Sequence, residues 1–331
     1  MFFLFYNLFK KDKKMKLHSF IIVLLFSIFI STVKSSAGDD DSRYNDCLDL
    51  CKIDVCEKNP PKLSLPLRLT FWSCEAECKY QCMFKNVWLR QENEEPIVQY
   101  YGKWPFYRFL GMQEPASVVF SFFNLYMHYI GLKRMNRVTP KNYYLHKIYT
   151  MNSFIGIYSW IASMVFHTRD TPVTEKFDYF GASASIICNC FVTIVRVLNI
   201  RDFKTIRAVF TVLFLYYLGH ISYLSFWMFD YSYNMFACTV IGIFTYALWL
   251  YWAYKNWYRP YAKQIVLTVL LTFCAMMFEL FDFSPFFFTF DAHSLWHLGT
   301  AIILKIYYDF YVNDVRWETR KGKDIDRSYY D

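Results

Sequence analysis

Long apolar blocks separated by short polar stretches fill most of the chain after residue 115. Seven of these blocks are long enough to predict membrane-spanning helices, because about 20 apolar residues cross the hydrocarbon core of a bilayer. They lie at roughly 116–132, 148–166, 177–198, 206–226, 233–254, 265–281 and 295–312. The pattern therefore predicts an all-α membrane protein in which residues 116–312 form a seven-transmembrane helix bundle.

The composition supports this class of protein. Of the 331 residues, 55% are hydrophobic and 22% aromatic, which exceeds the apolar share of an average soluble domain. The formal net charge of +8 would suit a nucleic-acid partner. However, the basic residues fall in short loops between apolar blocks, a distribution typical of membrane topology, so nucleic acid is not an expected partner.

The basic loops also predict an orientation. The loops after the first, third and fifth blocks and the tail 313–331 are rich in Lys and Arg, whereas the loops between them hold few or none. Basic loops face the cytosol. The region before the first block is therefore expected in the lumen, and the tail in the cytosol.

Residues 1–37 have the pattern of a signal peptide. A lysine-rich stretch precedes the apolar residues 17–33, and Ser35-Ser36-Ala37 provides the small residues typical of a cleavage site. Met15 is an alternative start, and a retained anchor helix is the alternative to cleavage. A signal peptide requires the same lumenal placement of the region that follows.

Six of the ten cysteines fall within 38–115, which is expected to form a small disulfide-rich lumenal domain. Spacings of four residues put several of them on one helix face, and Asn59-Pro60-Pro61 breaks the helix between two groups. A helical hairpin with nested disulfides fits this pattern. Its pairing would be Cys47–Cys82, Cys51–Cys78 and Cys56–Cys74, one of the fifteen that six cysteines allow. A zinc knuckle is the alternative, although its cysteines usually form tighter C-x-x-C pairs.

Five polar residues are expected at one depth of the bundle. Ser163 and His167 end the second block, Asp178 begins the third, and His293 and His297 begin the seventh. In the predicted topology all of these positions lie at the lumenal edge. Ionisable residues are costly in a membrane, so such a cluster indicates a functional site.

These residue types fit a catalytic zinc site. His293 and His297 share a helix face, and His167 supplies a third ligand, which leaves one position open for water. Zinc lowers the pKa of a bound water to near 7. Asp178 is expected to accept and return the proton, and Ser163 to donate a hydrogen bond to an oxyanion. Two alternatives stay open: plain hydrogen bonding between helices, and a serine-nucleophile triad, although no Gly-x-Ser-x-Gly motif surrounds Ser163.

Four further polar residues are weaker candidates. His220 and Glu279 lie near the lumenal ends of the fourth and sixth blocks, from which they could support the ligands. Asn124 and Glu114 could form hydrogen bonds across helices. For each of these, structural hydrogen bonding is favoured over catalysis. His128 is expected on the cytosolic side, too far away to be a ligand.

The spacing of the site residues resembles a known superfamily. Ser-x3-His, an Asp eleven residues later and a C-terminal His-x3-His resemble the CREST superfamily of seven-span hydrolases. By this resemblance Ser163, His167, Asp178, His293 and His297 occupy all five superfamily positions. The cysteine-rich region narrows the resemblance to the post-GPI attachment to proteins factor three family. The motifs that carry it are Cys47-x3-Cys51, Trp72-Ser73-Cys74-x3-Cys78-x3-Cys82, Tyr101-Gly102-Lys103-Trp104-Pro105-Phe106 and Gln113-Glu114-Pro115-Ala116-Ser117.

The resemblance implies a phospholipase A2-type ester hydrolase that removes the sn-2 acyl chain from the GPI anchor of anchored proteins. Together with the zinc site, it implies GPI-anchored proteins and membrane lipids as partners and no soluble cofactor. It implies the Golgi membrane in animals and the endoplasmic reticulum in fungi. The alternatives are a ceramidase-like lipid amidase and a non-catalytic receptor or trafficking factor on the same fold.

Overall fold

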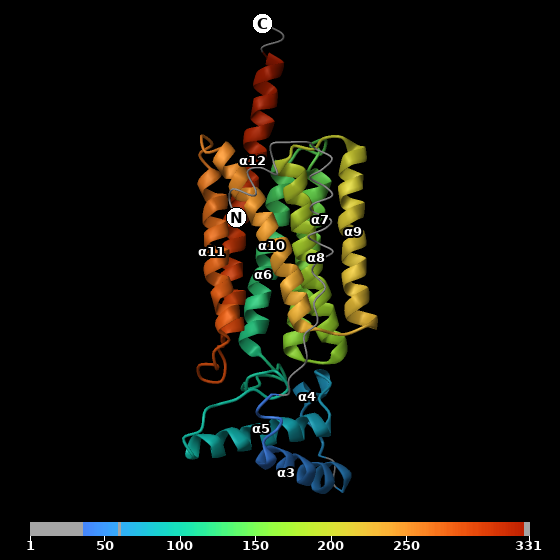
Figure 1. Ribbon diagram of the computed structural model, residues 1–331, viewed down its shortest axis with the longest axis vertical. Coiled ribbons are helices and arrows are strands. Elements are labelled where there is room, and N and C mark those ends of the chain that lie inside the picture. The colour runs from blue at the N-terminus through green and yellow to red at the C-terminus, as the bar shows by residue number, and fades with distance from the viewer. Residues whose placement is uncertain (1–35, 59–60, 328–331) are drawn as a thin grey trace.

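The chain is helical throughout the part that the structure describes, apart from its connecting loops. In the computed structural model this part is residues 36–58 and 61–327, so the expected signal peptide lies outside it up to residue 35. Figure 1 shows a bundle of long helices, α6 to α12, with the shorter helices α3 to α5 packed across one end. The all-α prediction is confirmed. The end of the bundle that meets α3 to α5 is called the disulfide end below.

Each predicted apolar block coincides with one helix of the bundle. The helices are α6 Pro115–Val138, α7 His146–Thr168, α8 Pro172–Val197, α9 Phe203–Phe226, α10 Tyr231–Lys255, α11 Ala262–Phe281 and α12 Ala292–Arg327. α12 continues well past the last apolar block, through much of the segment expected as a tail.

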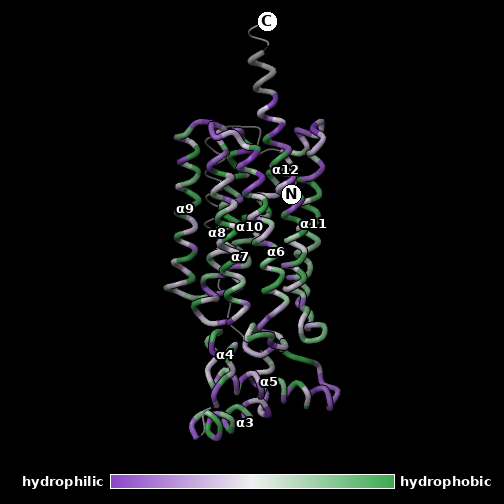
Figure 2. The backbone as a smooth tube through the Cα atoms, turned by 180° about the vertical axis from the view of Figure 1, so that it is seen from behind, coloured by the Kyte–Doolittle hydropathy of each residue, from purple (hydrophilic) through white to green (hydrophobic). Residues whose placement is uncertain are grey.

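Within the described residues, four helices are long and apolar enough to cross a membrane: α8, α9, α10 and α11. α6, α7 and α12 do not meet the same measure, so the expectation of seven apolar spans is confirmed for four only. The physical reason lies in polar side chains that face inward, such as Asn124 and His128 on α6 and Asn152 and Ser163 on α7, all buried. Such residues lower the mean hydropathy of a helix even though they face its neighbours. Figure 2 shows hydrophilic positions gathering at the end of the bundle opposite α3 to α5.

Contacts among four helices bring distant parts of the chain together. α6 packs against both α7 and α12, so the first and last helices of the bundle are neighbours. α7 packs in turn against α8. The approach of α6 and α7 is close at Gly156, where a Cβ would collide with the His128 ring. The end of α7, the start of α8 and the start of α12 therefore meet at the disulfide end (Figure 1).

A buried ion pair holds α8 against α12 at the opposite end of the bundle. The Arg196 guanidinium donates to the two carboxylate oxygens of Asp314 at 2.5 and 2.7 Å. Arg259 and Glu318 extend the pair into a network. This bidentate geometry fixes the relative position of α8 and α12 at that end of the bundle.

The short helices form a compact unit joined by three disulfides. This disulfide unit consists of α3 Ser42–Cys51, η1 Lys52–Glu57, α4 Leu65–Leu69 and α5 Cys74–Glu92. Its bonds are Cys47–Cys82, Cys51–Cys78 and Cys56–Cys74, so the nested pairing is confirmed. Side chains also cap the helices, because Asp41 accepts from the Arg43 amide and Ser73 from the Ala76 amide.

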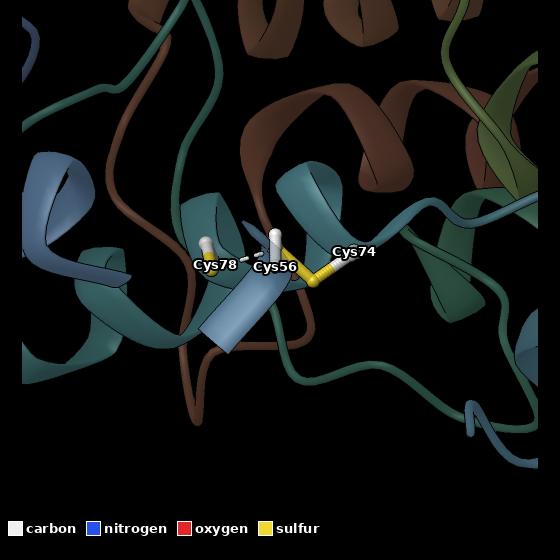
Figure 3. A group of neighbouring side chains, drawn as sticks. All are labelled: Cys56, Cys74 and Cys78. Atoms are coloured by element: carbon white, nitrogen blue, oxygen red, sulfur yellow. Dashed lines mark hydrogen bonds between the residues drawn. A yellow bond between two sulfur atoms is a disulfide. The ribbon is translucent and has the colours of Figure 1, made fainter. Parts of the chain in front are cut away.

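Three cysteines of the disulfide unit lie close enough together to suggest the alternative zinc knuckle. Cys56, Cys74 and Cys78 lie together, with the Cys56 and Cys78 sulfurs 3.7 Å apart (Figure 3). All three sulfurs are in disulfides, the last with Cys51. A zinc ligand must be a free thiolate, so these cysteines do not form a metal site in this structure.

Aromatic contacts attach the disulfide unit to the loop that leads into α12. Phe288 packs edge-on against Phe84 and Trp88 of α5 and against Tyr107. The Tyr107 amide donates to the Phe288 carbonyl at 2.8 Å. The start of α12 is therefore held by the disulfide unit as well as by the bundle.

The disulfides make a first prediction. Cys74→Ser removes the Cys56–Cys74 bond and is expected to destabilise the disulfide unit by about 2–5 kcal/mol, as for native bridges in small domains. Thermal unfolding and maturation in cells would measure the defect. Cys274→Ser is the control, because Cys274 is exposed and does not form a disulfide. Alkylation without reductant should modify none of the six paired cysteines of the wild type; six reactive thiols would contradict the framework.

Candidate metal centre

Three histidines converge at the disulfide end of the bundle. His167 lies in the last turn of α7, and His293 and His297 lie in the first two turns of α12. Their potential ligand nitrogens all lie within 4.8 Å of one another, and the Nε2 atoms of His293 and His297 are 3.0 Å apart. The structure thus brings together the three residues expected to bind zinc, although 126 positions separate His167 from His293.

The other ring nitrogen of each histidine has its own partner. His167 Nδ1 lies 2.7 Å from Glu114 Oε2, and His293 Nδ1 lies 2.7 Å from Glu279 Oε2. An ionised carboxylate can only accept, so each of these Nδ1 atoms donates the hydrogen bond, and Nε2 is the other ring nitrogen available to a metal. His297 Nδ1 lies 2.8 Å from the Ser121 hydroxyl. Partners on Nδ1 are the usual means of orienting metal-bound histidines.

The arrangement of Nε2 atoms fits a bound cation. His167 Nε2 is buried and has no hydrogen-bond partner among the described residues. The Nε2 atoms of His293 and His297 lie within hydrogen-bond distance of each other. A cation among the three atoms would satisfy all of them at once. Three imidazoles are also the ligand set of a catalytic zinc site, so the residues present fit the metal that the sequence predicts.

Glu114 connects His167 to a basic side chain outside the bundle. It precedes Pro115 at the start of α6, is buried, and its second carboxylate oxygen contacts the Lys103 ammonium. Its amide also donates to the His167 carbonyl at 3.0 Å. Burial alone would raise the pKa of Glu114, but Lys103 and His167 beside it hold the pKa well below its usual range. Glu114, expected only to bond across helices, therefore orients the His167 ring.

Ser163 and Asp178 lie beside the histidines. Ser163 is buried one turn before His167, and its hydroxyl is 3.1 Å from that of Ser121. Asp178 lies in the second turn of α8, a helix whose start is fixed by Pro172 and a Thr171 capping box. It is close enough to Ser163, His167 and His293 to interact with them. All five predicted site residues thus gather at one place.

The weaker candidates separate into two groups. Glu279 supports His293, and the Asn124 amide donates to the His297 carbonyl at 2.7 Å. His220 does not reach the site, since its ring bonds Tyr233 and Asn234 instead. It is a structural residue of the α9–α10 packing. His128, bonded to the Tyr308 hydroxyl, also lies outside the cluster.

Two contributors were not among the predicted site residues. Ser121 belongs to a stripe of buried polar residues on α6 at spacings of four, three and four: Ser117, Ser121, Asn124 and His128. That helical periodicity is a signal in the sequence for a polar face directed inward. Lys103 has no such signal, because its contact with Glu114 depends on how a loop folds back.

The fold and site define a helical membrane protein with a candidate metal centre at one end of its bundle. The chain belongs to the Per1-like family, whose model matches residues 64–315. It is 38% identical over 303 residues to Post-GPI attachment to proteins factor 3 of Drosophila melanogaster, covering 87% of this chain and 92% of that protein. It is 36% identical to Protein PER1 homolog of Schizosaccharomyces pombe, with 92% and 96% covered. It is also 36% identical to GPI-specific phospholipase A2-like PGAP3 of Cricetulus griseus, with 88% and 93% covered. No solved structure matches the chain.

A second prediction concerns the support of His167. Glu114→Gln removes the carboxylate that accepts from Nδ1 and leaves Lys103 with Asp170 alone. Zinc affinity is expected to fall by about 10–100-fold, the usual effect of losing an outer partner of a ligand. Competition with a chelator would measure it. Glu92→Gln, an exposed change at the end of α5, is the control. Equal affinity in both variants would show that Glu114 does not orient His167.

Proposed function

We propose that the protein is a zinc-dependent, GPI-specific phospholipase A2-type hydrolase that removes the sn-2 acyl chain during fatty-acid remodelling of GPI-anchored proteins. Relatives carry the names Post-GPI attachment to proteins factor 3 and GPI-specific phospholipase A2-like PGAP3. The observation that carries the chemistry is the convergence of three Nε2 atoms whose rings are oriented through Nδ1. The geometry supports a bound metal, and the names of the relatives favour an ester hydrolase over a receptor that only binds.

The chain's own residues would divide the work. His167, His293 and His297 would hold the zinc, which when bound would supply a Lewis acid able to activate water at neutral pH. Asp178, beside Ser163 and the histidines, would accept the proton of the attacking water and return it to the leaving alcohol. Ser163 would donate a hydrogen bond to the oxyanion formed at the attacked carbonyl.

The topology proposed for this function uses all seven bundle helices. α6, α7 and α12 would span the membrane together with α8 to α11, their polar faces turned toward one another. The alternation of basic loops supports a lumenal disulfide end and a cytosolic C-terminus. The site would then meet an ester in the lumenal leaflet, where the lipid of a GPI-anchored protein resides. We place the protein in the Golgi membrane, with the endoplasmic reticulum as the alternative.

Hydrolysis of defined lipids would test the proposal. Purified protein with bound zinc is mixed with a diacyl GPI-anchored protein, and the released fatty acid and the remaining lipid are identified by mass spectrometry. The expected products are one free fatty acid from the sn-2 position and a monoacyl anchor. Release of fatty acid from ceramide instead would favour the amidase. No turnover of either lipid by zinc-loaded protein would favour a non-catalytic role.

A further inference from the structure

A cavity lies where the disulfide unit meets the bundle. Its volume is about 330 Å³, within the range of small-ligand sites. Its walls come from α5, from the loop that contains Tyr101 and Lys103, and from the turn between α7 and α8 that contains Arg169 and Asp170. The histidine cluster uses none of these residues as ligands, so the cavity is a separate feature of the same end of the molecule.

The cavity combines aromatic rings with charged groups. Seven of its lining residues are aromatic, three are basic and two are acidic. Tyr101 is 54% exposed, and Lys79 lies 4.8 Å above its ring. Trp104 also lines the wall and is fixed there through its indole N–H, which donates to Asp282 at 2.8 Å. Exposed rings give stacking surfaces, and the acidic and basic groups give acceptors and donors for hydroxyls, amines and phosphates.

Arg169 is the basic residue of the cavity wall that is best suited to bind an anion. Its guanidinium packs on Trp72 at 4.4 Å, and one Nη donates to the Asp170 carbonyl at 2.8 Å. It makes no ion pair with a carboxylate among the described residues, and its Nε is buried without a hydrogen-bond partner. By contrast, Arg108 on the same indole is neutralised by Glu77 at 2.7 Å. An arginine with free N–H groups at a cavity wall is suited to bind a phosphate.

A short chain of contacts leads from the cavity to the metal centre. Lys103 lines the cavity and bonds both Asp170, at 3.1 Å, and Glu114. Glu114 in turn holds His167. A ligand seated against Arg169 and Lys103 is therefore only two side chains away from a zinc ligand. In a phospholipid the glycerol backbone connects the phosphate to the sn-2 ester, so neighbouring sites for the two groups would suit one molecule.

We propose that this cavity binds the phosphate and the first sugar residues of a glycosylated inositol phospholipid, with Arg169 on the phosphate and the Tyr101 ring on a sugar. This assignment rests on the proposed function and names the part of the substrate that the hydrolase recognises outside the membrane. The carboxylates of Glu75 and Asp170 accept hydrogen bonds from sugar hydroxyls or an amino sugar. Specificity for the glycolipid then arises from the headgroup, because acyl chains are common to all phospholipids.

Calorimetric titration of the full-length protein in detergent tests this assignment. The probe is glucosaminyl-inositol 1-phosphate, which carries the headgroup chemistry but no ester to hydrolyse; inositol 1-phosphate and inorganic phosphate are the comparison ligands. Arg169→Gln is expected to weaken binding of the probe by at least about tenfold, as for loss of a charge-assisted phosphate contact. Tyr101→Asn removes the ring but keeps a residue that tolerates the positive φ of 51° at this position. It should weaken the probe several-fold and leave inorganic phosphate unaffected.

Arg68→Gln is the matched control, because Arg68 belongs to α4 and does not line the cavity. Equal affinity for the probe and inorganic phosphate would reduce the site to a non-specific anion site. Probe binding that is unchanged in both Arg169→Gln and Tyr101→Asn would overturn the assignment. Fatty-acid release from a diacyl GPI lipid is measured in parallel. If the probe binds through Arg169 but no fatty acid is released, the proposed hydrolase activity is wrong and the headgroup site stands. If fatty acid is released and Arg169→Gln leaves the KM unchanged, the headgroup site is wrong and the hydrolase activity stands.

Discussion

His297→Ala is expected to abolish hydrolysis and to remove most of the bound zinc. His297 is buried at the centre of the cluster, with Nε2 facing His293 and Nδ1 held by Ser121. Two remaining imidazoles form a poor site, so zinc affinity should fall by more than the about 10–100-fold that loss of an outer partner costs. Zinc content of the purified protein and fatty-acid release would both be measured. His167→Ala and His293→Ala are expected to behave in the same way.

His220→Ala is the control for loss of a buried histidine. Its ring bonds Tyr233 and Asn234 between α9 and α10, away from the cluster. This variant is expected to keep its full zinc content, although its unfolding temperature should fall because two buried polar groups lose their partner. Full zinc occupancy in His297→Ala would contradict the assignment of His297 as a zinc ligand. Equal zinc loss in His220→Ala would indicate that the losses reflect general unfolding.

Asp178→Asn is expected to keep the zinc but lose turnover by about 10²–10⁴-fold, the usual contribution of general acid–base catalysis. Asp178 is not among the three ligands, yet it lies close enough to Ser163, His167 and His293 to interact with them. Asparagine preserves the size of the side chain and removes its capacity to accept a proton. The two measurements are zinc stoichiometry and the rate of fatty-acid release at saturating substrate.

Glu175→Gln offers a control on the same helix. Glu175 lies in the first turn of α8, three residues before Asp178, and is half-buried. It interacts with Asp178 and Lys103 through its charge alone, so Glu175→Gln should retain most of the turnover. Near-normal turnover in Asp178→Asn would mean that another group moves the proton. Glu279 would then be the next residue to test, since it already contacts His293 and the Tyr231 hydroxyl.

Local patterns in the sequence were sufficient to predict the helices and the disulfides. Apolar blocks bounded by basic loops match α6 to α12, and cysteines at helical spacing match the nested pairing. The hydropathy of three helices was overestimated. α6, α7 and α12 carry the polar residues of the site and its surroundings, so the same residues that indicate function reduce the signal for a membrane span. At these positions a polar side chain that suits the site makes its helix less apolar.

The residues around the three histidines were harder to predict than the histidine cluster itself. His293 and His297 are related by one helical turn, which a sequence displays directly. The contacts of Lys103 with Glu114, and of Ser121 with His297, join segments 11 and 176 residues apart. They depend on which faces of α6 and α12 meet and on how a loop folds over their ends. His220 was wrongly considered as a support for the ligands. It lies at a suitable depth along its helix, but its ring packs between α9 and α10 and not near the three histidines.

The order of the proposed zinc ligands along the chain has a consequence for how the protein would mature. His167 lies on the second bundle helix, whereas His293 and His297 lie on the last one to leave the ribosome. A nascent chain without α12 offers one imidazole of the three and leaves it bonded to Glu114. Because Phe288 packs the start of α12 against the disulfide unit, we expect a metal to be held well only after the N-terminal cysteines are oxidised and the last helix is inserted. Retained zinc would therefore report on the quality of the whole assembly, and a truncated or wrongly oxidised chain would be recognisable by its inability to keep the ion.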